Sequence, residues 1–220
     1  MTANDSFVPA LGRSEWTWIY DFAIALLTRE GRWRRALIDQ CAPKSEDVIL
    51  DVGCGTGTLV VLLKRRAPHA RVAGLDPDPD ILVRAQRKAK IGGLDIAFHQ
   101  GFARDADYAG AGHANKIISS LVFHQTPLEE KRAGFAAMYR ALRPGGELHI
   151  ADYGLQRTAL MRRLFRRVQQ LDGFENTEPN ALGVLPELMR EAGFAQVAER
   201  KVIPSPTGSI SLYFARKPDA

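Results

Sequence analysis

The chain has 220 residues, of which 45% are hydrophobic and 25% are charged, and its formal net charge is +5 at pH 7. This length suits one α/β domain with a sizeable core and leaves too little for a second domain. No apolar run approaches the roughly 20 residues of a membrane-spanning helix, no secretory signal opens the chain, and two cysteines cannot build a disulfide framework or a structural zinc site unaided. We therefore expect an enzyme of the reducing cytoplasm that has no metal site.

Two helices are predicted ahead of the first strand. Ser14 is placed to cap the first of them, which ends at Gly31, and residues 32–41 form the second, with an apolar side of helical spacing. We expect these helices to form an N-terminal helical cap over residues 1–45. Residues 46–220 are then expected to fold as one globular unit.

A short apolar run followed by three glycines is the most informative segment. The run Val48–Val52 is rich in β-branched residues and ends at a glycine, which predicts a strand buried on both faces of a parallel sheet. The glycines supply a turn at which backbone can approach a ligand closely, since they carry no Cβ; they are Gly53, Gly55 and Gly57. Thr56 or Thr58 is placed to cap the helix that follows.

The rest of the chain alternates between two periodicities. Further strands are predicted over 71–76, 96–100, 116–121, 147–152, 195–202 and 210–215, and helices over 58–67, 79–90, 128–142, 157–171 and 186–192. Residues 143–146, Arg-Pro-Gly-Gly, are expected to end the helix over 128–142 before the fifth strand, and residues 204–208 to form a Pro- and Gly-rich connection between the last two strands. The β/α alternation predicts an α/β fold with a doubly wound sheet.

The predicted helix over 157–171 is apolar on one side and basic on the other. Its basic side carries Arg157, Arg162, Arg163, Arg166 and Arg167. This pattern is typical of a solvated face over a core-packed stripe, of an anion-attracting lid, or of a helix on a membrane surface. Nucleic acid is not expected as a partner, because the basic residues are not interleaved with exposed-looking aromatics.

Two carboxylates narrow the kind of ligand. Asp51 stands directly ahead of the glycines, which fall as G-x-G-x-G and not as the G-x-G-x-x-G of a dinucleotide site. An acid there would repel a phosphate and suits a positive amino group. Asp76 ends the second strand, where it is placed to take two ribose hydroxyls. From Asp47 to its C-terminus the chain resembles the class I S-adenosylmethionine-dependent methyltransferases, and among them it is similar to the small-molecule enzymes of ubiquinone and menaquinone biosynthesis.

The resemblance implies a fold and a cofactor site. The fold is a Rossmann-like, seven-stranded, mostly parallel sheet with an antiparallel C-terminal hairpin. S-adenosylmethionine is expected over the glycine turn, with Asp51 toward its amino group, Asp76 and Pro77 at the ribose, and Tyr20 over the methionine end. The other residues expected at the cofactor are Cys54, Gly101, Phe102, Ala103 and Ser119. Gly101-Phe102-Ala103 replaces the family's Gly-Asp-Ala, so backbone contacts, stacking on Phe102 or a substitute acid such as Asp105 remain for the adenine.

The resemblance also implies methyl transfer by in-line displacement to a quinone-, lipid- or secondary-metabolite-like acceptor. Because the sulfonium already activates the methyl group, catalysis is chiefly alignment, and a base matters only if the acceptor arrives protonated. His124 is the first candidate for a general base or an acceptor-binding residue, and Asp152 and Tyr153 are weaker candidates. A helical lid is expected over about 155–192, with lipid contact possible through residues 157–167. A nicotinamide-dependent oxidoreductase and a binding scaffold without turnover stay open as alternatives, and oligomeric state is not predicted.

Overall fold

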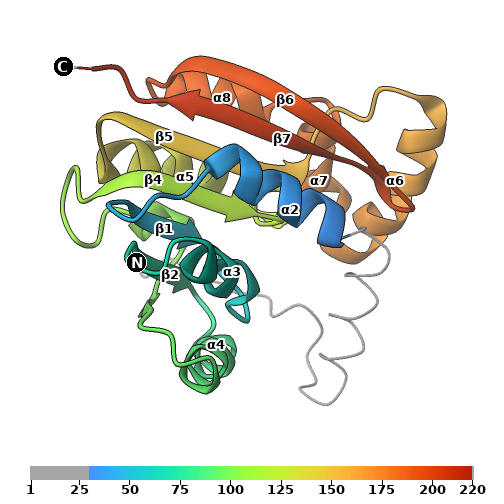
Figure 1. The fold of residues 1–220 in the computed structure, drawn as a ribbon. Coiled ribbons are helices and arrows are strands. Elements are labelled where there is room, and N and C mark those ends of the chain that lie inside the picture. Colours follow the sequence, from blue (N-terminus) through green and yellow to red (C-terminus); the bar gives the residue numbers. More distant parts are fainter. Residues whose placement is uncertain (1–29, 220) are drawn as a thin grey trace, which may run out of the picture.

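The computed structural model describes residues 30–219, in which one seven-stranded sheet lies between two layers of helices (Figure 1). The strands are β1 Val48–Val52, β2 Arg71–Asp76, β3 Ala97–Gln100, β4 Ala114–Ser120, β5 Leu142–Tyr153, β6 Ala195–Ser205 and β7 Gly208–Arg216. The helices are α2 Glu30–Cys41, α3 Thr58–Arg66, α4 Pro79–Ile91, α5 Leu128–Ala141, α6 Ala159–Asp172, α7 Phe174–Ala181 and α8 Leu185–Glu191, with 3₁₀ turns η1 Ala103–Asp105 and η2 Phe123–Gln125. No helix in this part of the chain is long and apolar enough to cross a membrane.

The strand order is β3-β2-β1-β4-β5-β7-β6, and the first five strands are mutually parallel. Strand β7 pairs antiparallel with both β5 and β6. The predicted mostly parallel sheet with an antiparallel C-terminal hairpin is therefore confirmed. The order reverses between β1 and β4, so the carboxyl ends of these two strands flank the switch point at which open α/β sheets bind ligands.

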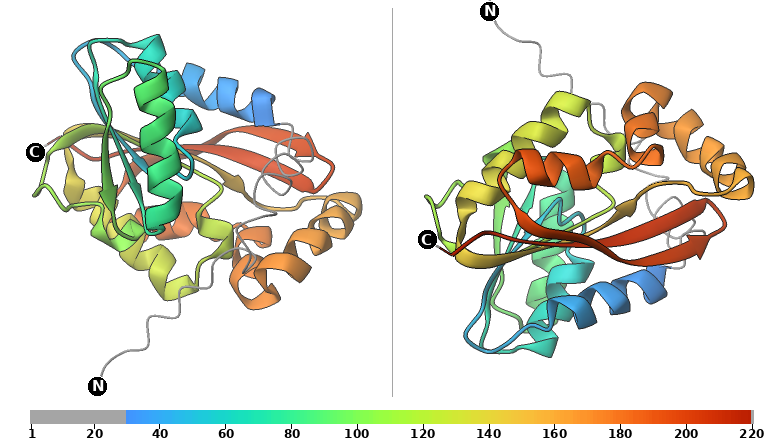
Figure 2. Two further views of the ribbon diagram at one scale, coloured as in Figure 1. Left: turned by 90° about the horizontal axis from the view of Figure 1, so that it is seen from below. Right: turned by 90° about the horizontal axis from the view of Figure 1, so that it is seen from above.

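Two cores fill the space between sheet and helices. Helices α2, α3 and α4 cover one face of the sheet and α5 and α8 cover the other, as two views of the ribbon show (Figure 2). Strand β1 faces both cores: Ile49 packs among the residues of α2 and α3, whereas Leu50 and Val52 pack with those of α5. Burial on both faces is the physical reason why this strand is a continuous apolar run.

Helices α6 and α7 cover neither face of the sheet. They pack on each other, and they contact the end of β7 and the turn η2 that follows β4 (Figure 1). They therefore lie beyond the carboxyl ends of the parallel strands, beside the switch point. Of the predicted N-terminal cap over 1–45, only α2 and the residues after it lie within the described part of the chain, and α2 packs against β5 and β7.

The predicted break over residues 143–146 is confirmed, because helix α5 ends at Ala141 and regular pairing with β4 resumes at Glu147, with Gly145 at φ +71°. Two other local features differ from the expectation. Strands β6 and β7 stay paired through Ser205 and Gly208, so the connection expected over 204–208 is only a two-residue turn. Helix α7 was not predicted, since its sequence contains an internal Pro179 and few apolar residues.

Candidate active site

The glycine turn after β1 lies over the end of β2. The backbone N–H groups of Gly53 and Cys54 both donate to the carbonyl of Leu75, at 2.8 and 3.0 Å. All three glycines have positive φ, which L-residues with side chains rarely adopt. A Cβ on Gly53 would lie 2.1 Å from Val122 Cγ2, whereas a Cβ on Gly55 would meet nothing within 4 Å. Gly53 thus serves packing, and Gly55 leaves backbone open to a ligand.

Helix α3 begins without the predicted threonine cap. Its N-cap is Gly57, and no side chain caps its first turn. The hydroxyls of Thr56 and Thr58 instead accept hydrogen bonds from Lys88 Nζ, at 3.2 and 2.7 Å, and this lysine comes from α4. The first turn of α3 therefore keeps N–H groups that are free of side-chain caps, next to the open backbone of Gly55.

Asp51 is a buried carboxylate without a hydrogen-bond donor in the described part of the chain. The residue is 1% exposed, and neither of its carboxylate oxygens has a partner there. Burial raises the pKa of Asp51 to about 8, and the positive charge of Arg34 only partly opposes this. Buried charges are normally paired, so ionisation of Asp51 at neutral pH requires a cation beside it. An ammonium group seated at the glycine turn would supply it.

Asp76 is held at the carboxyl end of β2 by backbone donors. Its Oδ2 accepts from the N–H of Gly55 at 2.8 Å, and its Oδ1 accepts from the N–H of Asp78 at 3.1 Å. Burial raises the pKa of this carboxyl group. The two donors fix the carboxylate beside the glycine turn and leave lone pairs for hydroxyl donors. Pro77 follows it, and its carbonyl accepts from Gln100 Nε2 at 3.2 Å.

The loop after β3 holds the Gly101-Phe102-Ala103 triplet. Gly101 N–H donates to the Asp76 carbonyl at 3.1 Å, which brings this loop against the ribose-side acid. Asp105 Oδ2 accepts from Phe102 N–H at 2.9 Å, and the Arg104 guanidinium lies 4.4 Å from the centre of the Phe102 ring. Asp105 is thus already used to shape its own loop. The alternatives predicted for the adenine, which are backbone contacts, stacking on Phe102 and Asp105 as a substitute acid, stay predictions.

Two predicted cofactor residues turn their side chains into the protein. Ser119 is fully buried, and its hydroxyl donates to the Val52 carbonyl at 2.7 Å, which ties β4 to β1. Cys54 packs against Gly74, where an added Cβ would lie 2.7 Å from its sulfur, and burial raises the pKa of its thiol. These residues can contribute backbone to a ligand site. Tyr20 lies outside the described residues.

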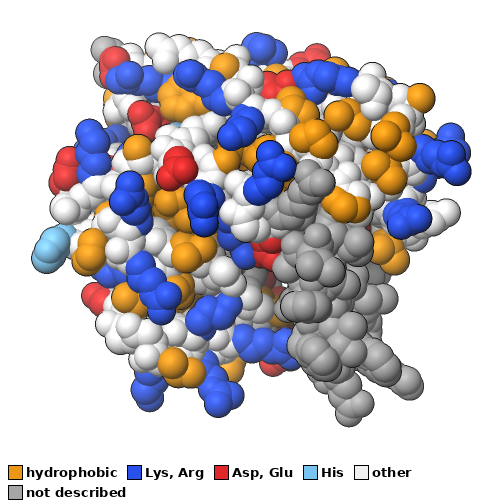
Figure 3. All heavy atoms as spheres, turned by 45° about the vertical axis from the view of Figure 1, so that its right-hand side comes forward, with side chains coloured by type: hydrophobic (Ala, Val, Ile, Leu, Met, Phe, Trp, Pro, Cys, Tyr) orange, Lys and Arg blue, Asp and Glu red, His pale blue; other side chains and the backbone are white. Residues whose placement is uncertain are grey.

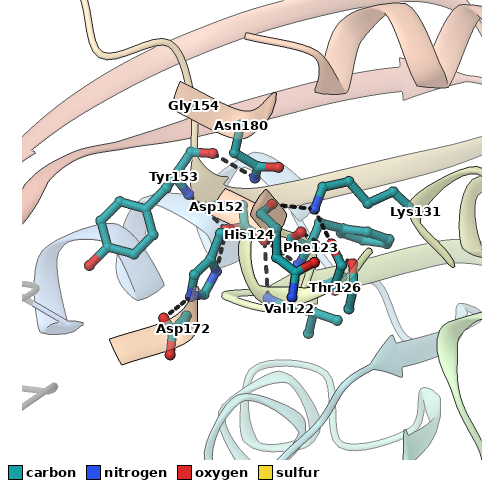
Figure 4. A network of polar contacts seen from close by, with 12 residues as sticks. Val122, Phe123, His124, Thr126, Lys131, Asp152, Tyr153, Gly154, Asp172 and Asn180 are labelled. Carbon is teal, nitrogen blue, oxygen red and sulfur yellow. Dashed lines mark hydrogen bonds and ion pairs between the residues drawn. The ribbon is translucent and has the colours of Figure 1, made fainter. Parts of the chain in front are cut away.

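His124 joins the sheet to the helices beyond it (Figure 4). Its Nδ1 lies 2.8 Å from Asp152 Oδ1, and its Nε2 lies 3.3 Å from Asp172 Oδ2 at the end of α6. Burial alone would lower the pKa of His124, but the two carboxylates outweigh it and raise this pKa to about 9. At neutral pH the ring is therefore an imidazolium that donates through both nitrogens. In this arrangement it cannot accept a proton.

Asp152 organises the loop on which His124 stands. Its Oδ2 accepts from the N–H groups of Val122 and Phe123, at 3.0 and 2.7 Å, and its Oδ1 accepts from the N–H of Tyr153 at 2.8 Å. Asp152 is 0% exposed. The predicted residues His124, Asp152 and Tyr153 are thus brought together, and the His124 and Tyr153 rings meet edge to face at 5.0 Å. These contacts show that Asp152 positions the loop.

Lys131 is a second buried cation in this network, and sequence reasoning missed it. It is 0% exposed, and its Nζ donates to the carbonyl of Thr126 and, at 2.9 Å, to that of Asn176 in α7 (Figure 4). Burial lowers its pKa to about 8. The signal was present, since Lys131 shares the buried side of α5 with Phe135 and Met138. His124 and Lys131 together fasten α6 and α7 to the loop after β4.

A groove in the described residues lies elsewhere. An open groove of about 840 Å³ runs between α2 and the strands β6 and β7, and its lining includes Arg32, Arg35, Arg200, Lys201 and Phe214. None of the predicted site residues lines it. The chemistry described above therefore belongs to the carboxyl ends of the parallel strands and not to this groove.

Comparison with known proteins adds a family description. A model of a methyltransferase domain matches residues 49–146. Over 136 residues the chain is 35% identical to a demethylmenaquinone methyltransferase from Thermus thermophilus, a match that covers 61% of this chain and 60% of that protein. Over 171 residues it is 30% identical to a demethylmenaquinone methyltransferase from Chlorobaculum parvum, which covers 75% of this chain and 66% of that protein. The matches therefore span less than two thirds of these relatives.

A solved structure shares the fold over nearly the whole chain. The S-adenosylmethionine-dependent methyltransferase SibL superposes with a TM-score of 0.68 at 20% identity, covering 96% of this chain and 60% of that one. At this identity the likeness concerns the fold alone. The segment that the methyltransferase-domain model matches includes β1 from Ile49 onward, the glycine turn, Asp76 and His124.

Proposed function

We propose that the chain is a class I S-adenosylmethionine-dependent methyltransferase that transfers a methyl group to a small-molecule acceptor of the quinone class by in-line displacement. The methyltransferase-domain match and the methyltransferase relatives support this proposal. The observation that carries the proposal is Asp51, a buried carboxylate with no donor in the described part of the chain, beside the open backbone of Gly55. A cofactor with a cationic amino group and a ribose fits this arrangement, whereas a pyrophosphate does not.

The residues present fit the cofactor at two of its ends. Asp51 would pair with the amino group, and Asp76 would accept from the ribose hydroxyls with the oxygens that Gly55 and Asp78 hold in place. The adenine would lie along the loop of Phe102, which offers backbone groups and an aromatic ring. When bound, the cofactor supplies an activated methyl group. The chain's own task is then to align the acceptor and to exclude water.

The acceptor class rests on the relatives. Those described above are named for demethylmenaquinone, so a quinone nucleus is the acceptor that we propose for this chain. His124 is protonated at neutral pH in this arrangement, so we propose that it holds the lid helices over the acceptor and does not remove a proton. Tyr153 lies against its ring, and the Tyr153 hydroxyl is hydrogen-bonded to the Thr207 hydroxyl at 2.7 Å.

The setting of the reaction is also a proposal. The two cysteines, Cys41 and Cys54, are free and buried, which is compatible with the predicted cytoplasmic location. A quinone with an isoprenoid chain is a lipid, so the enzyme would collect its acceptor at a bilayer. The basic face at residues 157–167 is the predicted place of contact.

Calorimetry and a methylation assay test the proposal. The chain is titrated with S-adenosylhomocysteine and, separately, with NAD, and then incubated with S-adenosylmethionine and a demethylated naphthoquinone. We expect S-adenosylhomocysteine to bind, NAD to give no heat, and the quinone to gain one methyl group. Binding of NAD alone would favour the oxidoreductase alternative. Cofactor binding without methylation of any quinone would reject the acceptor class and point to another acceptor or to a scaffold.

A further inference from the structure

One exposed stripe on the lid helices combines apolar and basic side chains. It consists of Leu160, Arg163, Arg167 and Leu171 on α6, followed by Phe174 at the start of α7, and we call it the lid surface. The α6 members are spaced by three, four and four residues, which places them along one side of a helix. Leu160, Leu171 and Phe174 are 64%, 65% and 62% exposed. Large apolar side chains at this exposure and in this number favour a contact partner.

The positive charge of this surface is not neutralised within the described part of the chain. Arg157 pairs with Glu199, and Arg162 lies 3.6 Å from Glu178. Residues 163, 166 and 167, all arginines, form no ion pair there. The one acid at the end of α6, Asp172, is turned inward to His124. A partner that complements this surface must therefore be anionic as well as able to accept apolar side chains.

The lid surface is carried by the helices that close the proposed site. Asp172 of α6 contacts His124, and α7 accepts a hydrogen bond from Lys131, so the inner side of the same two helices faces the loop after β4. On the side of the molecule that carries α6, basic and apolar side chains lie interspersed over the surface (Figure 3). A partner bound to the outer side would lie next to the place at which an acceptor must enter.

An anionic bilayer fits these observations better than another protein. Arginine near an anionic membrane surface gains roughly 1 kcal/mol per residue, and leucine and phenylalanine beside it can enter the acyl boundary, as in interfacial helices. We propose that the lid surface docks on an anionic lipid bilayer, so that a lipid-borne acceptor passes from the bilayer into the site. This inference rests on the proposed function for its acceptor, but docking is measured without catalysis.

The structure offers a matched control on α4. This helix also exposes two large apolar residues, Val83 at 61% and Ile91 at 78%, and it carries Arg84 and Arg87 on exposed positions. It packs on β2 and β3 at the other side of the switch point, away from α6 and α7. If exposed arginines and apolar residues bound lipid wherever they occur, substitutions on α4 would weaken vesicle binding as much as substitutions on the lid surface do.

Co-sedimentation with vesicles tests the docking. Vesicles of phosphatidylglycerol and phosphatidylcholine are compared with phosphatidylcholine alone, for the full chain and for its variants. We expect binding to the anionic vesicles only, a loss of about 25-fold for the double variant R163Q/R167Q, and a loss of about tenfold for each of Leu171→Ser and Phe174→Ser. The control variants R84Q/R87Q and Ile91→Ser should stay within about twofold of the unaltered chain in the same assay. Equal losses on α4, or equal binding to both kinds of vesicle, would overturn the proposal.

Two further measurements exclude other occupants. The first measurement adds inorganic phosphate at constant ionic strength. If phosphate displaces the chain from vesicles, and Leu171→Ser and Phe174→Ser do not change vesicle binding, the surface is a site for a free anion. The second measurement is light scattering: if the lid variants have fewer copies per particle than the unaltered chain, the surface is an interface between copies. Either result rejects bilayer docking. Because the substituted residues are exposed, thermal unfolding should be unchanged, which separates a docking defect from misfolding.

Turnover then separates this inference from the proposed function. Each variant is assayed with a short-chain, water-soluble quinone and with a long-chain quinone embedded in anionic vesicles. We expect R163Q/R167Q to retain turnover of the soluble acceptor and to lose more than tenfold on the embedded one. If neither acceptor is methylated by the unaltered chain, the quinone assignment fails while the vesicle measurement still decides the docking. If turnover of the two acceptors by R163Q/R167Q falls equally, the arginines do not act through the bilayer.

Discussion

The protonation state of Asp51 makes cofactor binding dependent on pH. Burial raises its pKa to about 8, so about 90% of the chain carries a neutral Asp51 at pH 7. The ammonium group of S-adenosylhomocysteine pairs only with the ionised form. Binding at pH 7 should therefore release about 0.9 proton, and the affinity should rise about tenfold per pH unit from pH 6 to pH 7 and level off above pH 8.

Calorimetry in two buffers measures both effects. S-adenosylhomocysteine is titrated at pH 6, 7 and 8 in phosphate and in Tris, whose ionisation enthalpies differ, so that released protons appear as a difference in heat. In Asp51→Asn we expect weaker binding, equal heats in both buffers and no change of affinity over this range. The same heats in both buffers for the unaltered chain, or a pH profile that Asp51→Asn retains, would refute the pairing of this carboxylate with the amino group.

Three further predictions concern the stability of the site. Because the pKa of His124 is raised from 6.5 to about 9, its protonation contributes about 3 kcal/mol to the free energy of unfolding; this contribution is complete below pH 6.5 and is lost as the pH rises through 9. The difference in the free energy of urea unfolding between the unaltered chain and His124→Gln should follow this pH dependence. Lys131 has the opposite sign: its pKa is lowered from 10.5 to about 8, so the free energy of unfolding of the unaltered chain should rise by about 3 kcal/mol relative to Lys131→Met between pH 8 and 10.5. A flat difference would show that burial does not lower the pKa of this lysine. Gly53→Ala should destabilise the fold by about 2–5 kcal/mol, since its Cβ would meet Val122. Gly55→Ala should lower the stability measured by thermal unfolding by only about 1 kcal/mol, and it should weaken the binding of S-adenosylhomocysteine more than it weakens the fold.

The central strands of the sheet were predictable from sequence because they are buried on both faces. Strand β1 was predicted with the bounds that the structure has, since an apolar run that ends at a glycine has few other interpretations. The C-terminal hairpin of β6 and β7 was harder to predict. Strands β6 and β7 remain paired up to a two-residue turn although Pro204 lies in β6, and a proline is tolerated there because β6 is an edge strand. Helix α7 left no clear signal, because tertiary contacts rather than local preference hold its eight residues.

The two halves of the candidate site also differ in how far they could be predicted from sequence. The cofactor half is local: Asp51 and the three glycines lie within seven residues, so spacing alone indicated a ligand with an amino group. The network of His124 is not local, since Asp152 and Asp172 follow it by 28 and 48 residues. A sequence shows which residues can titrate, but it does not show which charges will face them. For that reason His124 was predicted as a candidate base without its second carboxylate.

The charge of His124 follows from the position of α6. Two carboxylates raise its pKa, and only one of them, Asp152, belongs to the sheet; the other, Asp172, arrives with the lid helix. If α6 moved away, the raising contribution of Asp172 would be lost, and with it part of the burial that lowers this pKa. These two losses act in opposite directions, so the charge of His124 depends on the sheet and α6 together. His124, which sequence analysis ranks as a candidate base, therefore acts in the described structure as the donor that joins β5 to α6.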